Sequence, residues 1–145
     1  MTASLLPDDY IADVHTRLVV YKRIAGMETK EDLKELQVEL IDRFGLLPLP
    51  AKNLFRITEL KQVAAPMGVR KFEIGSEAGR ILFGSEPDID TGRLVDLIQR
   101  KPDRFRFEGG NTLRLYGDFF AEEERFSIVS DMLELLSGQD NQLQN

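Results

Sequence analysis

Apolar residues recur at steps of three and four through the first half of the chain, which is the spacing of one face of an α-helix. In the second of these segments, Leu33, Leu36, Leu40 and Phe44 form such a stripe. A glycine follows each segment, and glycine is common where a helix ends in a left-handed conformation. The pattern therefore predicts three helices, over residues 13–25, 29–44 and 50–67.

From Val69 onward, short runs alternate between apolar and polar residues, which is the two-residue period of a half-buried β-strand. Glycine-containing turns join these runs in pairs, so we expect two hairpins. A helical pattern follows each pair, over about 91–101 and 121–136. The expected strands cover residues 69–74, 80–83, 105–107 and 113–116.

These elements predict an α+β fold in which a helical part, 13–68, packs on a β-β-α-β-β-α part, 69–137. The hairpins favour a mainly antiparallel sheet with helices on one face. A length of 145 residues suits one domain, which we expect to cover 1–137. The segment 138–145 is rich in Gln and Asn, and we expect it to form a polar tail.

The composition excludes several classes of chemistry. With no Cys, one His and a net charge of −6, the chain has no thiol nucleophile, no Cys-ligated metal site and no summed charge that attracts nucleic acid. His15 has no nucleophile motif beside it, and Asp8 with Asp9 supplies too few ligands for a hard cation. No glycine loop has the pattern that binds phosphates. We therefore expect no catalytic, cofactor-binding or metal-binding residue and no enzyme activity in this chain.

The sequence also argues against a membrane protein. No apolar run approaches the roughly 20 residues that cross a bilayer, and the N-terminus lacks the basic flank and apolar core of a signal peptide. A cytoplasmic location fits the lack of Cys.

The second predicted helix carries an acidic stripe opposite its apolar one. At 100° per residue, Glu31, Glu35, Glu39 and Asp42 fall on one side of the helix, and Val38 falls beside them. One interpretation is an acidic face that is merely solvated. The other is a docking surface for arginines, which bind carboxylates through two parallel hydrogen bonds.

A locally basic stretch leaves a second alternative open. Phe105 and Phe107 alternate with Arg104 and Arg106, and further cations flank them. The period of two is typical of a half-buried strand with Phe inward and Arg outward. The alternative is a weak nucleic-acid-binding module in which bases stack on the phenylalanines beside the arginines.

Two groups of motifs resemble the C-terminal domain of bacterial transcription-repair coupling factors. The first group combines LPDDYI at 6–11 with TRL at 16–18 and YKRIA at 21–25. The second combines VELIDRFG at 38–45 with the prolines that follow it. The resemblance covers about the first 65 residues by motif and the rest by the order of elements. His15 departs from the family, which commonly has Asn there.

The resemblance implies that this chain is the end of a larger cytoplasmic bacterial protein, an ATP-dependent DNA translocase that displaces stalled RNA polymerase and recruits nucleotide excision repair through UvrA. The parts that bind ATP, Mg and RNA polymerase would lie upstream. In that family the C-terminal domain clamps an N-terminal UvrB-like module and masks its UvrA-binding surface. The matching motif assigns the clamp carboxylates to Glu39 and Asp42, with Glu35 and Val38 as peripheral candidates.

Overall fold

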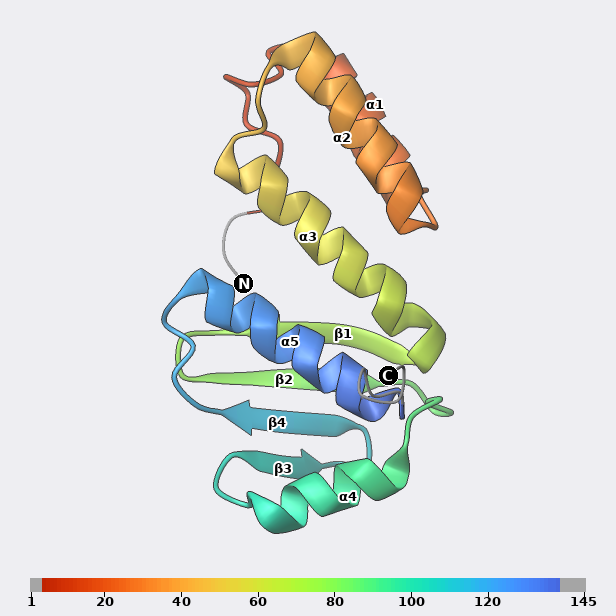
Figure 1. The fold of residues 1–145 in the computed structure, drawn as a ribbon, viewed down its shortest axis with the longest axis vertical. Coiled ribbons are helices and arrows are strands. Elements are labelled where there is room, and N and C mark those ends of the chain that lie inside the picture. Colours follow the sequence, from red (N-terminus) through yellow and green to blue (C-terminus); the bar gives the residue numbers. More distant parts are fainter. Residues whose placement is uncertain (1–3, 139–145) are drawn as a thin grey trace, which may run out of the picture. The chain divides into compact units, whose positions relative to one another are not determined.

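The computed structural model describes residues 4–138, which divide into two compact units (Figure 1). We call residues 2–62 the helical unit and residues 63–145 the mixed unit. Of the tail predicted for 138–145, all but Gly138 lies outside the described residues. The division falls within a few residues of the expected change from helices to strands at Val69.

The three expected helices are present, and each begins within one residue of its predicted start. Asp13 accepts a hydrogen bond from the backbone N–H of Thr16, and Thr29 accepts one from the backbone N–H of Asp32. The first and the second helix therefore both have side-chain N-caps. Gly45 ends the second helix with φ of 92°, a conformation that favours glycine. The helices are α1 (Val14–Ala25), α2 (Lys30–Phe44) and α3 (Leu49–Ala64).

The third helix ends earlier than the sequence pattern predicts. Residues 65–67 form a short 3-10 helix, η1 (Ala65–Met67), instead of continuing α3. Pro66 explains the change, because proline lacks an N–H and its ring clashes with the carbonyl of the preceding turn. Gly68, at φ of 81°, then leads into the first strand.

The core of the helical unit forms around the apolar stripe of α2. Leu33, Leu36 and Leu40 are at most 1% exposed. Tyr10 adds polar contacts, since its hydroxyl lies 2.7 Å from the carbonyl oxygen of Gly45 and donates to it. The other fully buried members of this cluster come from the N-terminal segment, α1, the α2–α3 loop and α3: Leu6, Ile11, Val20, Ile24, Leu47, Ala51 and Phe55.

The mixed unit contains a four-stranded antiparallel sheet, which confirms the α+β fold class. The strand order is β1-β2-β4-β3, so the second hairpin attaches to the first through β4. Helices α4 and α5 lie on one face of this sheet (Figure 1). The elements are β1 (Val69–Ile74), β2 (Ala78–Phe83), α4 (Thr91–Arg100), β3 (Phe105–Glu108), β4 (Thr112–Tyr116) and α5 (Glu122–Leu136).

The two faces of the sheet differ in chemistry. Ile81, Leu113 and Leu115 are fully buried and share the inner face with Phe105 and Ile74. Residues between them in the sequence point the other way, because successive side chains of a strand alternate. The sheet therefore presents a polar outer face. The inner face packs on buried residues of α5: Phe126, Val129, Leu133 and Leu136.

Leu36→Ala and Val38→Ala make a matched test of this packing, because both residues lie on α2. Leu36 is 1% exposed and Val38 is 61% exposed. We expect Leu36→Ala to lower the free energy of unfolding by about 2–5 kcal/mol, and Val38→Ala to change it by less than about 0.5 kcal/mol. Urea denaturation followed by circular dichroism measures both, and equal losses would contradict the assignment of the core.

Candidate interaction site on helix α2

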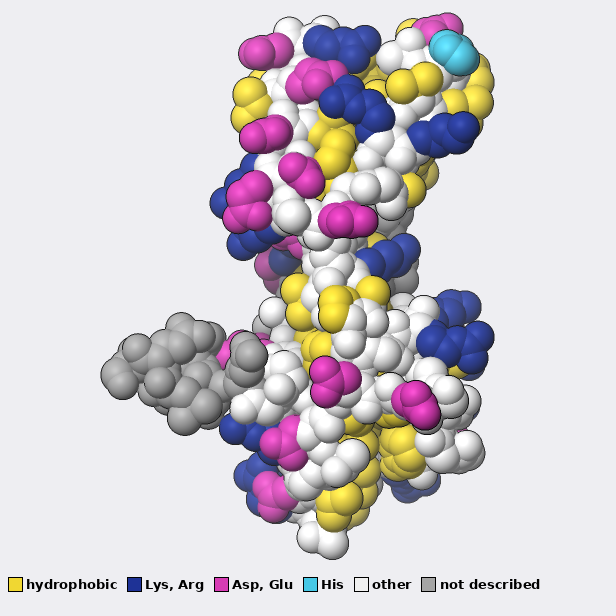
Figure 2. Space-filling model, turned by 90° about the vertical axis from the view of Figure 1, so that its right-hand side faces the viewer, with side chains coloured by type: hydrophobic (Ala, Val, Ile, Leu, Met, Phe, Trp, Pro, Cys, Tyr) yellow, Lys and Arg dark blue, Asp and Glu magenta, His cyan; other side chains and the backbone are white. Residues whose placement is uncertain are grey.

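The structure places all four predicted site residues on the surface of α2. Val38 is 61% exposed, and the Glu39 side chain is 38% exposed. Glu35 and Asp42 are also exposed. They are three or four residues apart, so their side chains are neighbours along one side of the helix. Figure 2 shows one face of the molecule, on which acidic, basic and apolar side chains are interspersed.

Glu39 is held by an arginine of the same unit. Arg23 donates from Nη1 to Oε2 at 2.5 Å and from Nη2 to Oε1 at 2.9 Å, which is the two-bond geometry of a strong arginine–carboxylate pair. Arg43, one turn along α2, lies 3.4 Å from Oε2. The carboxylate expected to receive a partner's arginine is therefore already bound within the chain.

These contacts change the acidity of Glu39. The hydrogen bonds from Arg23 stabilise the ionised carboxylate and lower the pKa of Glu39 below its ordinary value, and Arg43 adds a smaller effect in the same direction. The same bond raises the pKa of Arg23. At neutral pH both groups are therefore charged and paired.

Sequence reasoning missed Arg23 as a site residue, although a signal was present. Lys22 and Arg23 lie in the last turn of α1, and a short loop leads from there into α2. Helices joined by a short loop are usually antiparallel neighbours, so a cation on α1 can face the acidic stripe of α2. The loop alone does not place that cation at Glu39, which lies in the third turn of α2. The sequence did not show which of the two cations would face Glu39.

Asp42 remains accessible beside an apolar spot. Asp42 is exposed, and within residues 4–138 no cation lies close enough to it to form an ion pair. Val38 lies one turn before Asp42, and Ile41, next to Asp42, is 38% exposed. An apolar spot beside a charged group is the composition of a small protein–protein contact.

A hollow of about 570 Å³ lies on another side of α2. Ile41 and Leu46 supply apolar surface to it, and Leu46 is 84% exposed. Its lining has three cations, Lys34, Lys52 and Arg56, and one carboxylate, Glu59, so it is net basic, in contrast to the acidic side of the helix. The candidate site thus has an acidic side and a basic, partly apolar side, with Ile41 between them.

The positions of the two phenylalanines in the structure argue against the nucleic-acid-binding alternative. Phe105 is 3% exposed and faces the helices, so no base can stack on it. Phe107 is 40% exposed, but its ring lies 6.4 Å from that of Phe83. Arg106 points to the opposite face of the sheet, where its guanidinium lies over Tyr116. Alternation along β3 separates Arg106 from the phenylalanines, as in an ordinary half-buried strand. Arg104 precedes β3, and its guanidinium lies 5.7 Å from the centre of the buried Phe105 ring.

Within residues 4–138, no three His, Asp or Glu side chains lie close enough together to hold a metal ion. None of the helices in that range is long and apolar enough to cross a membrane. The surface of α2 offers charged hydrogen bonding and a small apolar contact, which is the chemistry of recognition between proteins.

Comparison with known proteins identifies the family. The family model described as the TRCF domain matches residues 1–94, which is more than half of the chain. The chain belongs to the TRCF domain family. The match takes in the helical unit, the first hairpin and the start of α4, and it includes the α2 residues discussed above.

Similar proteins extend the TRCF match toward the C-terminus. The transcription-repair-coupling factor of Haemophilus influenzae is 42% identical over 134 residues, which are 92% of this chain and 12% of that protein. The factor of Escherichia coli K12 is 42% identical over 133 residues, again 92% of this chain and 12% of that protein. The chain therefore spans about one eighth of the length of these relatives.

A solved structure confirms the fold. The crystal structure described as the C-terminal domain of transcription-repair coupling factor superposes with a TM-score of 0.71. The superposition covers 97% of this chain and 92% of that one, at 23% sequence identity. The TRCF fold therefore includes the mixed unit as well as the helical unit.

Replacing Arg23 tests the Glu39 pair. In Arg23→Gln we expect the pKa of Glu39 to rise toward its ordinary value, because the hydrogen bonds to the ionised form are lost. An NMR titration of the Glu39 carboxyl carbon measures the change. Lys22→Gln is the matched control, since it removes one charge from the same turn of α1 and leaves the pair intact.

The same pair predicts a pH dependence of stability. Glu39 has a lowered pKa in the folded state, so the contribution of the pair to stability is fully present above the ordinary pKa of an unfolded glutamate. This contribution is lost as the pH falls through the lower, folded-state pKa. The difference in unfolding free energy between the unaltered chain and Arg23→Gln should therefore shrink as the pH is lowered from neutral through the ordinary titration range of a glutamate and below it. A difference that stays constant would contradict the pair.

Proposed function

We propose that this chain is the regulatory C-terminal domain of a transcription-repair coupling factor that acts in the bacterial cytoplasm. In this proposal, the whole protein uses ATP to move along DNA, displaces stalled RNA polymerase and recruits nucleotide excision repair. Membership of the TRCF family and the names of the relatives support it. Catalysis would belong to parts of the protein outside this chain.

Within this role, α2 clamps an N-terminal UvrB-like module of the same polypeptide and masks its UvrA-binding surface. The exposed Asp42 and Val38 support this assignment, because they offer a charged acceptor and an apolar contact on one side of the helix. A contact within one polypeptide benefits from a high effective concentration, so a small interface suffices to hold it closed. Exposed ion pairs of about 0–1 kcal/mol each also let it open.

The two clamp carboxylates have different roles in this proposal. Asp42 can accept a hydrogen bond from an arginine of the module directly. Glu39 must either share its carboxylate with that arginine or give up Arg23, which occupies both of its oxygens. Arg23 therefore acts as an internal competitor that keeps the clamp weak enough to release.

The test uses the full-length factor and its binding of UvrA. We expect Asp42→Asn to increase the amount of UvrA retained in a pull-down several-fold, and Glu39→Gln to have a smaller effect because Glu39 is partly satisfied by Arg23. Glu124→Gln with Asp131→Asn, on α5, is the control for loss of acidic charge. Unchanged UvrA binding in both clamp variants, with the fold intact, would overturn the proposed role of α2.

Replacing Arg23, the internal competitor, should have the opposite effect on UvrA retention to replacing Asp42 or Glu39. Arg23→Gln frees Glu39 for an arginine of the module, so we expect a tighter clamp and less UvrA retained than by the unaltered factor. Lys22→Gln should leave UvrA retention unchanged. More UvrA retained by Arg23→Gln would show that Arg23 supports the clamp and does not compete with it.

A further inference from the structure

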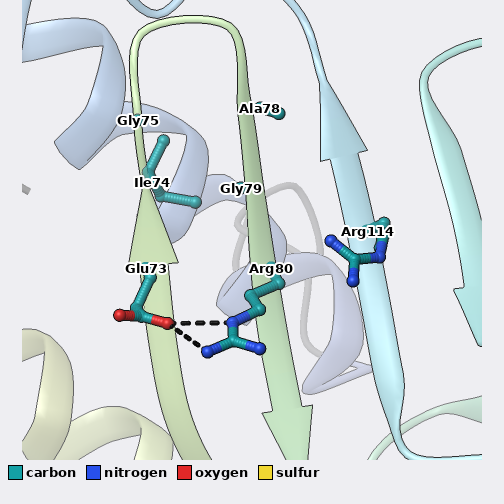
Figure 3. Close-up of a pocket in the computed structure, with 7 residues that line it drawn as sticks. All are labelled: Glu73, Ile74, Gly75, Ala78, Gly79, Arg80 and Arg114. Carbon is teal, nitrogen blue, oxygen red and sulfur yellow. Dashed lines mark hydrogen bonds and ion pairs between the residues drawn. The ribbon is translucent and has the colours of Figure 1, made fainter.

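Three arginines form a row across the outer face of the sheet. Arg80 of β2 pairs in register with Arg114 of β4, and Arg114 pairs with Arg106 of β3. Their side chains point away from the face that α4 and α5 cover. Figure 3 shows Arg80 and Arg114 in front of the strands, with helices behind the sheet. We call Arg80, Arg114 and Arg106 the arginine row.

The row is only partly neutralised by its own sheet. Glu73 accepts from Arg80 Nη2 at 2.7 Å, and Glu108 accepts from Arg114 Nε at 2.6 Å. Arg106 has no ion pair in the part of the chain that the structure describes, and its guanidinium lies 5.8 Å from the centre of the Tyr116 ring. Like charges directly opposite on neighbouring strands are unfavourable. The arginine row therefore carries positive charge that the carboxylates of the sheet do not fully neutralise.

The positive charge of the arginine row is local and contrasts with the net negative charge of the whole chain. Lys71 adds to the three arginines, and Glu73 and Glu108 are the carboxylates of the outer strand positions. Four cations thus face two carboxylates at these strand positions, in a chain whose net charge is −6. The side chains are accessible, since Arg80 is 40% and Arg114 is 42% exposed.

A shallow hollow lies at one end of the row. It has a volume of about 380 Å³. Its lining consists of Glu73, Ile74, Gly75, Ala78, Gly79, Arg80 and Arg114, so two arginines and one carboxylate border small and apolar residues. The close-up in Figure 3 shows these residues on the β1–β2 hairpin and the neighbouring β4. A modest apolar side chain fits a hollow of this kind while charged groups beside it meet the arginines.

We propose that the outer face of the sheet binds an acidic α-helix of another polypeptide, lying across the strands with its carboxylates on the arginine row. Neighbouring strands are about 4.8 Å apart, and side chains one turn apart on a helix are about 5–6 Å apart. Consecutive turns of an acidic helix therefore meet consecutive arginines. Arginine binds carboxylates through two parallel hydrogen bonds, which makes the match directional.

The same face is a poor match for nucleic acid. Arg106 covers the Tyr116 ring, and Phe105 is buried, so the face offers no stacking platform for bases. A long polyanion would also extend past the row into a chain of net negative charge.

The test uses this chain and two fluorescent, alanine-rich helical peptides of equal composition. One carries Glu at i, i+4, i+7 and i+11, on a single face, and the other spreads the same Glu residues around the helix. Fluorescence anisotropy at low and at physiological salt measures binding. We expect the one-face peptide to bind about tenfold more tightly than the other, because only its carboxylates reach all three arginines together.

Variants of the chain locate the binding surface. Arg80→Gln, Arg106→Gln and Arg114→Gln together should weaken binding about tenfold. The matched control is Arg93→Gln, Arg100→Gln and Lys101→Gln, which removes the same charge at α4 and should change affinity by less than about twofold. Glu73→Gln with Glu108→Gln should tighten binding, because it removes the competing carboxylates. Arg106→Gln alone weakens binding without breaking an ion pair of the sheet.

Three results would overturn the proposal. One is equal affinity for the two peptides, and another is an equal loss in the row variant and in its α4 control, with circular dichroism showing both folded. The third is tighter binding of a single-stranded DNA oligonucleotide than of the one-face peptide, lost in the row variant, which would assign the face to nucleic acid. These outcomes do not depend on UvrA and are therefore independent of the proposed clamp.

Discussion

Burial of Leu33, Leu36 and Leu40 is the constraint on which the helical unit and its surface depend. These side chains lie at the centre of a core made by the N-terminal segment, α1 and α3. Their burial fixes the rotation of α2 about its axis, because a helix has only one apolar stripe to cover. The carboxylates on the opposite side of α2 must therefore lie on the surface. The acidic site is thus a consequence of core packing as well as of its own residues.

Contact between α1 and α2 decides how that acidic surface behaves. Arg23 reaches Glu39 and forms a two-bond pair, whereas Asp42, one turn further along, stays available. Glu39 and Asp42 lie on the same side of the helical wheel, but they differ in the charges around them and in what they can bind. A surface with one satisfied and one accessible carboxylate is suited to reversible contact, since no single strong pair dominates it.

In the mixed unit too, the buried side of each element determines what its exposed side presents, but here the side chains alternate with the two-residue period of a strand. Alternation along the strands sends Ile81, Leu113 and Phe105 toward the helices, and it sends Arg80, Arg114 and Arg106 outward. The antiparallel register then aligns the arginines in one row across three strands. Both units thus present charged surfaces whose geometry is determined by what each element buries on its other side.

The sequence by itself determined the element order, the α+β class, the apolar stripe of α2 and the exposure of Glu35, Val38, Glu39 and Asp42, because these follow from local periodicity. The two-residue period was also sufficient to place Arg106 on the opposite face of β3 from Phe105 and Phe107, as one of two interpretations. Pro66 indicates the early end of α3, although the apolar periodicity alone did not predict it. The sequence did not reveal the pairing of Glu39 with Arg23 or the alignment of the arginine row. Only the tertiary structure decided these, because each depends on which side chains from distant parts of the sequence meet, and periodicity along one segment contains no information about its neighbours.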